Sequence, residues 1–197
     1  MEKKKQPILL DLPEELCGER VRIRPYRAGD GAAMWEAVEE SREHIRAWLP
    51  WGSFHATPDD SEAFVRRALA KWILREDIAL GLWDLATGRF LGGIGLHRIN
   101  WDIPAFEIGY WLRATAEGKG YMTEAVRLLC DFTFRTLQAQ RVEIRCDVRN
   151  ERSAAIPRRL GFTQEAILRN DGRNHQEELR DTFIFSMIPV EYAKRKS

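Results

Sequence analysis

The chain of 197 residues lacks several features that would assign it to a class at once. It contains no run of about 18 apolar residues, so no transmembrane helix is expected. Its lysine-rich start is followed by no apolar core or cleavage site of a signal peptide. The cysteines (Cys17, Cys130 and Cys146) are too few and too widely spaced for a disulfide framework. We therefore expect a cytoplasmic protein with reduced thiols.

An excess of charge of one sign is also missing, because 31 basic residues balance 30 acidic ones and leave a net charge of +1. This balance does not favour general binding to nucleic acid, and no membrane association is expected. The histidines (His44, His55, His97 and His175) are scattered without metal-ligand spacing, so no metal is expected.

What is present is typical of a globular protein, with 44% hydrophobic and 31% charged residues. Alternation of apolar and polar residues predicts strands at 21–25, 78–85, 89–99, 105–112, 141–148, 162–169 and 178–188. Helical spacing predicts helices over 31–49, from 58, over 121–137 and over 151–160, with Asp30 and Thr57 as N-caps of the first two and a turn at 170–174. We expect one mixed α/β domain over 1–197 on a single sheet, with 1–7 a flexible tail.

The segment 110–125, YWLRATAEGKGYMTEA, carries the clearest chemical signal. A strand leads through Gly118-Lys119-Gly120 into an amphipathic helix, whose first amide groups and dipole favour an anion. The loop matches neither GxGxxG nor GxxxxGK[ST], so a dinucleotide or nucleoside triphosphate site is not indicated. It predicts either a pyrophosphate cradle or a flexible strand-to-helix turn.

A second segment, NERSAAIPRRLGF at 150–162, follows the strand that ends at Val148. Asn150 suits the N-cap of the helix that follows, and Ser153 suits its first turn. Capping is compatible with a contact to a ligand, so both interpretations of Asn150 stay open.

These segments resemble the GNAT superfamily of acyl-CoA-dependent N-acetyltransferases and, within it, the Rim-type branch that acetylates the N-termini of ribosomal proteins. The resemblance runs through almost the whole chain. It includes RPYRAGD at 24–30, HIRAWLPW at 44–51, GGIGLHRI at 92–99, FEIGYWL at 106–112, GKGYMTEA at 118–125, NERS at 150–153, LGF at 160–162 and LRDTFIFSMI at 179–188.

The resemblance implies a mostly antiparallel sheet of about seven strands, splayed in the middle and flanked by about four helices. Acetyl-CoA would lie in the splay as the cosubstrate. Its pantetheine arm would bind the strand end at Trp111, Leu112 and Arg113, and its pyrophosphate would bind Gly118, Lys119, Gly120, Tyr121 and Met122. Asn150 would contact it from the other side.

Two positions depart from the superfamily pattern. Thr115 stands where an Arg or Gln is usual, three residues before the first loop glycine. Pro157 stands where many members carry the Tyr that protonates the departing thiolate. Members of the Rim-type branch, like this chain, have a serine at position 153, so Ser153 is the expected proton donor.

Three acidic residues are candidates at the acceptor side. Glu107 on the strand 105–112 is the expected general base, since an apolar wall would raise its pKa; the alternative is a solvated glutamate. Asp171 is a second candidate base, at a place where the Rim-type branch has a Glu, and water alone is a third option. Asp181 is expected to orient the acceptor amine or to serve as a structural hydrogen-bond acceptor.

The stretch Trp48-Leu49-Pro50-Trp51 lies between two predicted helices. Trp48 and Trp51 are expected either to line the acceptor pocket or to fill the core between those helices. Cys130 and Cys146 are expected to be core thiols rather than nucleophiles.

The leading hypothesis is an enzyme that moves an acetyl group from acetyl-CoA directly to a primary amine, first of all the α-amine of a protein such as a ribosomal protein. A small amine (polyamine, amino acid or aminoglycoside) is the alternative acceptor. A catalytically idle acyl-CoA sensor is the alternative from another class, kept open by Pro157. The resemblance also implies a homodimer.

Overall fold

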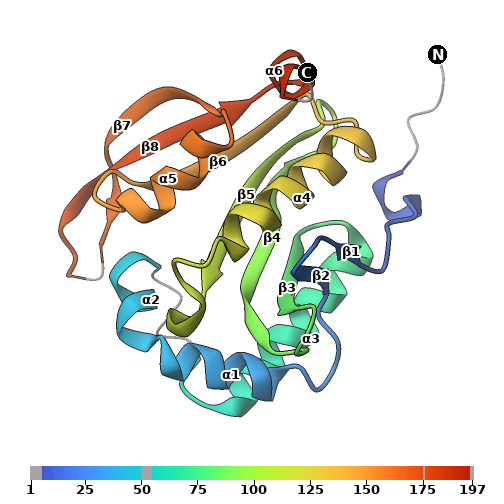
Figure 1. Cartoon of the computed structure of the whole chain (residues 1–197), viewed down its shortest axis with the longest axis vertical. Coiled ribbons are helices and arrows are strands. Elements are labelled where there is room, and N and C mark those ends of the chain that lie inside the picture. Colours follow the sequence, from blue (N-terminus) through green and yellow to red (C-terminus); the bar gives the residue numbers. More distant parts are fainter. Residues whose placement is uncertain (1–5, 50–54, 175, 196–197) are drawn as a thin grey trace.

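The computed structural model describes residues 6–49, 55–174 and 176–195. Within them, eight strands form one sheet in the order β1-β2-β3-β4-β5-β6-β8-β7. The strands are β1 (Leu16–Cys17), β2 (Val21–Pro25), β3 (Ile78–Asp84), β4 (Phe90–Asn100), β5 (Ala105–Leu112), β6 (Arg141–Asp147), β7 (Thr163–Arg173) and β8 (Leu179–Met187). All neighbours are antiparallel except β5 and β6 (Figure 1), so the expected mixed and mostly antiparallel sheet is confirmed.

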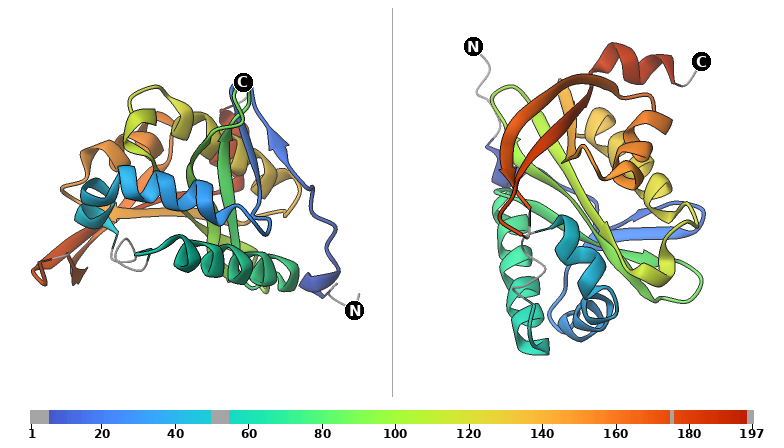
Figure 2. Two further views of the ribbon diagram at one scale, coloured as in Figure 1. Left: turned by 90° about the horizontal axis from the view of Figure 1, so that it is seen from below. Right: turned by 90° about the vertical axis from the view of Figure 1, so that its left-hand side faces the viewer.

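Helices cover both faces of this sheet. They are α1 (Gly31–Glu40), α2 (Arg42–Trp48), α3 (Pro58–Leu74), α4 (Tyr121–Arg135), α5 (Glu151–Arg159) and α6 (Pro189–Lys194), with short 3-10 turns η1 (Pro7–Leu9) and η3 (Ala114–Ala116). The right-hand view of Figure 2 shows α4 and α5 on one side of the sheet and α1 and α3 on the other. A sheet that is buried on both faces needs apolar residues at odd and at even positions of its central strands, because side chains alternate between the two faces.

Strand alternation divides these apolar residues between two cores. On β5, Phe106 and Ile108 belong to the large core under α4, and Tyr110 packs against it. Trp111, of the opposite parity, packs against the smaller core formed with α1 and α3. The two faces predicted for this strand are therefore confirmed.

The one parallel pair of strands is short. Ala105, Phe106 and Glu107 of β5 pair with residues 141–143 of β6, and beyond Glu107 the two strands share no further pairing. Strand β6 pairs instead with β8 from Val142 to Asp147, while β5 stays paired with β4. The sheet therefore opens between β5 and β6, as the splay implied by the resemblance requires.

The prediction of one helix over 31–49 is wrong, because the chain breaks at Ser41. The Ser41 side chain is buried, and its hydroxyl accepts the N–H of Ala114 at 2.8 Å. The backbone departs from helical geometry at this serine. A tertiary contact thus sets the break that helical periodicity alone does not show.

Of the two predicted N-caps, Thr57 caps its helix through its side chain and Asp30 does not. Thr57 caps α3 through a capping box with Asp60, which confirms that prediction. Asp30 does precede α1, but its carboxylate makes no cap; it binds the guanidinium of Arg24 at 2.7 and 2.9 Å. A bidentate ion pair is a stronger interaction for a carboxylate than a neutral amide donor.

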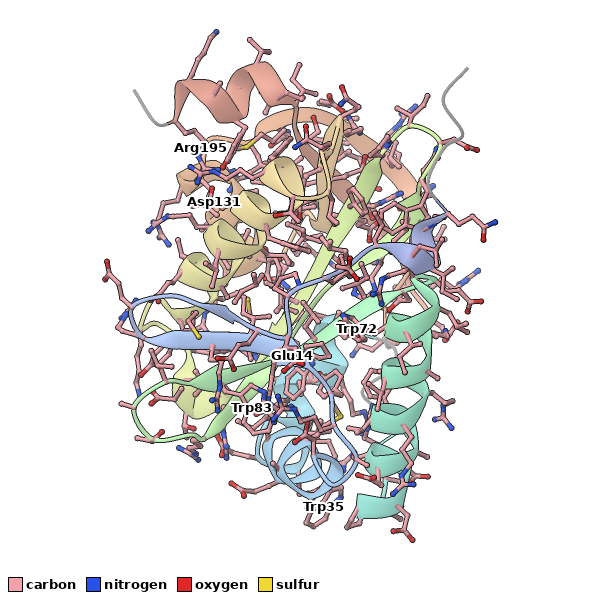
Figure 3. The ribbon with its side chains drawn as sticks, turned by 90° about the vertical axis from the view of Figure 1, so that its right-hand side faces the viewer. Glu14, Trp35, Trp72, Trp83, Asp131 and Arg195 are labelled. Atoms are coloured by element: carbon pink, nitrogen blue, oxygen red, sulfur yellow. The ribbon has the colours of Figure 1, made fainter. Side chains whose placement is uncertain are left out.

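The end of the chain also differs from expectation. Strand β7 continues to Arg173 through the predicted turn at 170–174, with a register shift between Leu168 and Gly172. Strand β1 and helix α6 were not predicted; α6 docks on α4, where the Tyr192 hydroxyl donates to Asp131 at 2.7 Å. In Figure 3, Asp131 on α4 and Arg195 after α6 lie close together.

A buried ion pair connects the end of β5 to helix α1. Arg113 is only 1% exposed, and its guanidinium donates to the carboxylates of Glu40 and Glu36 and to the carbonyl of Phe90. Glu40 also accepts the N–H and hydroxyl of Thr115. These hydrogen bonds, led by that from Arg113, lower the pKa of Glu40 to about 2.

Replacing Glu40 by Gln should therefore lower the free energy of unfolding at pH 7 by roughly 2–3 kcal/mol. The folded pKa of Glu40 lies below its ordinary value of 4.5, so this stabilisation is present above pH 4.5 and is lost as pH falls towards about 2. Urea unfolding at pH 7 and pH 3 measures both points. The control Glu39→Gln removes a half-exposed ion pair to Arg42 and should cost less than about 1 kcal/mol; equal losses in both variants would contradict the assignment.

Candidate active site

A cavity of about 1030 Å³ occupies the opening between β5 and β6. Residues 107–112 of β5 form one wall, and residues of α5, β6 and β8 form the other. The loop 117–120 and the first turn of α4 close one end, and residues of α2 border it. The cavity is thus built from segments that lie more than a hundred residues apart in the chain.

The glycine loop before α4 is shaped for an anion. Gly118 and Gly120 have φ values of +71° and +83°, which side chains rarely adopt. No side chain caps α4, and the amide groups of residues 118–123 find no acceptor among the described residues. The Lys119 ammonium donates to the Thr115 carbonyl at 2.8 Å and keeps positive charge beside the loop. Free amides, a helix dipole and a lysine together suit a pyrophosphate.

Strand β5 offers backbone groups to the same cavity. Since residues 108–112 have no partner on the β6 side, their N–H and C=O groups on that side face the opening. Trp111 and Leu112 line the cavity, as do Tyr121 and Met122 of the first turn of α4. Arg113 does not: its amide donates to the Leu91 carbonyl, and its side chain is buried against α1. An amide-bearing chain can therefore extend along β5 as far as Leu112.

Helix α5 brings two hydroxyl groups together at the other wall. Asn150 caps α5 by accepting the Ser153 N–H at 3.0 Å, and both residues line the cavity. The Ser153 hydroxyl donates to the Tyr110 hydroxyl at 3.2 Å, and Tyr110 donates to the Ser153 carbonyl at 3.0 Å. Burial raises the pKa of Tyr110 well above its ordinary value, so the phenol stays protonated at neutral pH.

The sequence does not single out Tyr110 as a site residue. Alternation places it on the apolar face of its strand, and its ring does pack there. The sequence gives one signal for this role: Tyr110 carries a hydroxyl, although its neighbours on the same face of the strand are apolar and the face packs against a helix. A buried Tyr needs a partner for its hydroxyl, but the sequence does not say which.

Glu107 lies at the point where the splay begins. Its carboxylate lines the cavity, and one oxygen is buried without a hydrogen bond to any described residue. Arg98 approaches that oxygen at 3.3 Å as an ion pair. Burial raises the pKa of Glu107 despite the nearby positive charges of Arg98 and Arg145. A carboxylate with a raised pKa, one oxygen of which accepts no hydrogen bond from any described residue, is suited to accept a proton.

The remaining acceptor-side candidates divide into those at the cavity and those away from it. Trp48, at the end of α2, lines the cavity, while Trp51 lies outside the described residues. Asp171 lines it too, in an ion pair with Arg145 at 2.9 Å. Asp181 is not part of the lining; its carboxylate accepts the Asn170 N–H at 2.9 Å, which is the structural alternative foreseen for it.

The cysteines are placed as core thiols. Cys130 is buried in the main core, and burial raises its pKa to about 12. Cys146 borders the cavity, but burial raises its pKa to about 11, so its thiolate is scarce at neutral pH. Since the thiolate is the nucleophilic form, direct transfer between two bound substrates suits the site better than a cysteine intermediate.

Neither a metal-binding group nor a membrane-spanning helix is found in the described parts of the chain. No group of three or more His, Cys, Asp or Glu side chains there is arranged to hold a metal ion. No helix among those residues is long and apolar enough to cross a membrane.

This geometry suits an enzyme that transfers an acyl group from a thioester with a long, phosphate-bearing arm. A model of the acetyltransferase (GNAT) domain family matches residues 20–163. The chain therefore belongs to the GNAT family of acetyltransferases, whose acetyl donor is acetyl-CoA.

Two similar proteins indicate the branch of the family to which the chain is related. The "Putative ribosomal N-acetyltransferase YdaF" of Bacillus subtilis (strain 168) is 30% identical over 182 residues, covering 90% of this chain and 96% of the relative. The "Ribosomal-protein-serine acetyltransferase" of Escherichia coli (strain K12) is 25% identical and covers 69% of this chain and 75% of its own length. Both names fit the Rim-type branch.

Solved structures share the fold. The crystal structure of a "Probable acetyltransferase" has a TM-score of 0.83 at 27% identity, covering 89% of this chain and 98% of that one. RimL, the ribosomal L7/L12 acetyltransferase solved with coenzyme A, has a TM-score of 0.82 at 20% identity, with the same coverage. At that identity the second likeness concerns the fold alone.

Gly118→Ala should raise the Kd for CoA about tenfold, because a left-handed backbone costs an L-residue roughly 1–2 kcal/mol and the loop relaxes away from its anion-binding shape. Titration calorimetry with CoA measures this change.

Gly29→Ala is the matched control, since Gly29 also has a positive φ (+97°) and open space around it but does not line the cavity. It should strain the protein to a similar degree and leave the Kd for CoA unchanged. Equal effects on the Kd in both variants would contradict a phosphate role for the loop.

Proposed function

We propose that this enzyme acetylates the N-terminal α-amine of a protein, such as a ribosomal protein, with acetyl-CoA as donor. The observation that carries the proposal is the division of chemical groups between the two faces of β5. Glu107 points to one face, and Tyr110, three residues on, points to the other, where it meets Ser153. An acceptor and a donor can therefore approach the splay from opposite sides.

Glu107 is the proposed base. An α-amine has a pKa of about 7.7–8.0, so about one in seven molecules is neutral at pH 7, against roughly one in a few thousand for a lysine amine. A carboxylate with a raised pKa, alone or through water, is sufficient to take the proton that the α-amine loses on attack. Asp171 is the less favoured alternative, because its carboxylate accepts a hydrogen bond from Arg145 at 2.9 Å, whereas Glu107 is paired with Arg98 without a hydrogen bond.

Ser153 is the proposed proton donor to the sulfur, with Tyr110 behind it. The amine nitrogen forms the new C–N bond, the C–S bond breaks, and the sulfur leaves as a thiolate that takes up a proton. The Ser153 hydroxyl, which donates to the Tyr110 hydroxyl in this structure, can turn to the sulfur and give it that proton. The Tyr110 phenol, which donates to the Ser153 carbonyl, can then turn its proton to the serine oxygen, and solvent restores the phenol. This pair supplies from β5 the phenol that Pro157 cannot supply from α5.

The charge of the cavity favours a peptide over a polyamine or an aminoglycoside. Its lining carries the cationic side chains of Arg98, Lys119, Arg145, Arg152, Arg159 and Arg180 and the carboxylates of Glu107, Glu117, Asp147 and Asp171. A polycationic acceptor would meet more like charge than opposite charge there. The names of YdaF and of the E. coli relative support the same choice. The predicted cytoplasmic location and homodimer stay predictions.

Glu107→Gln should lower kcat on an N-terminal peptide by about 10²–10⁴-fold, the usual contribution of a general base, and leave the Kd for CoA unchanged. Release of CoA thiol from acetyl-CoA measures kcat. In the unsubstituted enzyme kcat should also fall as pH drops through the raised pKa of Glu107, because the deprotonated form is the base; the Gln variant should lack this dependence.

The control for that experiment is Glu165→Gln, which removes an exposed carboxylate on β7 that is bound to Arg141 and does not line the cavity. Its kcat should stay within about twofold of the unsubstituted value. Full activity of Glu107→Gln over the whole pH range would rule out Glu107 as the base.

Ser153→Ala and Tyr110→Phe should each lower kcat by about 10–10²-fold, and the double variant should lose little more than either one, because the two hydroxyls act as one unit. The helix cap survives both changes, since Asn150 binds the backbone of residue 153. Losses that multiply in the double variant would argue against a shared proton path.

A further inference from the structure

Strands β6 and β8 present a polar face to the acceptor side of the cavity. Paired residues of neighbouring strands share a face: Cys146 lies opposite Phe183, and Arg158 of α5 stacks on the Phe183 ring at 5.2 Å. The next pair, Asp147 and Thr182, must point to the other face, away from α5. Glu107 of β5 has its paired partner Glu143 on β6 at the same parity, so it shares this second face.

Thr182 carries a hydroxyl that nothing in the described structure uses. The residue is 2% exposed, it lines the cavity, and its Oγ1 has no hydrogen-bond partner among the described residues. A buried hydroxyl without a partner costs about 1–3 kcal/mol, so its usual explanation is a ligand or water that completes it.

Arg180 lies two residues before Thr182 on the same face of β8 and also lines the cavity. Other arginines of this face are engaged: Arg98 faces Glu107, and Arg145 binds Asp171 at 2.9 Å. The guanidinium of Arg180 makes no ion pair with any described residue.

Asp147, whose pKa the charge of Arg180 helps to lower, is already bound to another arginine. Both carboxylate oxygens of Asp147 accept from the guanidinium of Arg149, at 3.0 and 2.7 Å. Gly172 stands opposite Arg180 in the hairpin, and a Cβ there would come within 3.2 Å of its Nε. The absence of a side chain at this position leaves the guanidinium room beside the cavity.

We propose that Arg180 and Thr182 bind a carboxylate of the acceptor, while the amine of the acceptor lies at Glu107. A planar guanidinium binds a carboxylate through two parallel hydrogen bonds, and the Thr182 hydroxyl can donate a third. The acceptor is then an amine that carries an anionic group: a peptide with an acidic side chain near its N-terminus, or a free amino acid with its α-carboxylate. This inference specifies the acceptor of the proposed acetylation and rests on it.

The test compares C-terminally amidated peptides that have a free serine α-amine and carry Asp, Asn or Lys at the second, third or fourth position. Binding to the enzyme loaded with CoA is measured by calorimetry, and acetylation is measured separately with acetyl-CoA. We expect the best Asp peptide to bind about 10–100-fold more tightly than its Asn counterpart. Arg180→Gln and Thr182→Val should weaken binding of the Asp peptide and leave that of the Asn peptide unchanged.

Two variants control for effects of overall charge and folding. Arg169→Gln removes an exposed arginine of β7 that does not line the cavity, and it should keep the preference for the Asp peptide. Thr182→Ser keeps the hydroxyl and should keep most of that preference. A preference lost equally in Arg169→Gln and Arg180→Gln would overturn the proposal, since general charge would then explain it.

The remaining outcomes separate this inference from the proposed function. Equal binding of the Asp and Asn peptides, or no binding of any amine, overturns the carboxylate site. Binding of free aspartate or glutamate that depends on Arg180, without binding of peptides, supports the site and identifies an amino acid as its occupant. A preference for Asp that depends on Arg180, with no acetylation of any amine, supports the site and refutes the proposed activity alone.

Discussion

The site depends on one constraint in the sheet: β5 and β6 pair over three residues and then separate. Backbone groups that a continuous sheet would use for pairing are left facing a cavity, where an amide-bearing substrate can replace the missing strand. The separation also admits side chains from both neighbouring strands. If the two strands stayed paired, the glycine loop, the first turn of α4 and the hydroxyls of Tyr110 and Ser153 would not line one cavity.

Buried charge holds the border of this opening in position. Arg113 lies at the end of β5, and its ion pair with Glu40 fixes that end against α1. Glu117, in the loop before α4, binds His44 of α2 at 2.5 Å and Arg152 of α5 at 2.6 Å. The anion-binding loop is therefore attached to helices on both sides of the cavity. Arg113 and Glu40, which do not line the cavity, and Glu117, which does, together hold the loop in place.

In the proposed reaction the base and the acid lie on opposite faces of one strand, because side chains alternate between the two faces along β5. A base and an acid that lay together would hydrogen-bond to each other instead of to the two substrates. Glu107 and Tyr110 differ in parity, so β5 itself keeps them on opposite faces. In the proposed reaction the proline at position 157, where many members of the superfamily have a tyrosine, is compatible with catalysis, because the phenol comes from the strand and Ser153 from the helix.

The sequence by itself determined the features that depend on a few consecutive residues. The capping box at Thr57, the two faces of β5 and the glycine loop before α4 follow from local rules and agree with the structure. Only the tertiary structure decided the break at Ser41, the burial of Arg113 and the pairing of Tyr110 with Ser153. These contacts join residues 43 to 77 positions apart. Local propensity carries no information about such partners, since a hydroxyl or a guanidinium has the same local preferences whether it ends in water, in an ion pair or at a substrate.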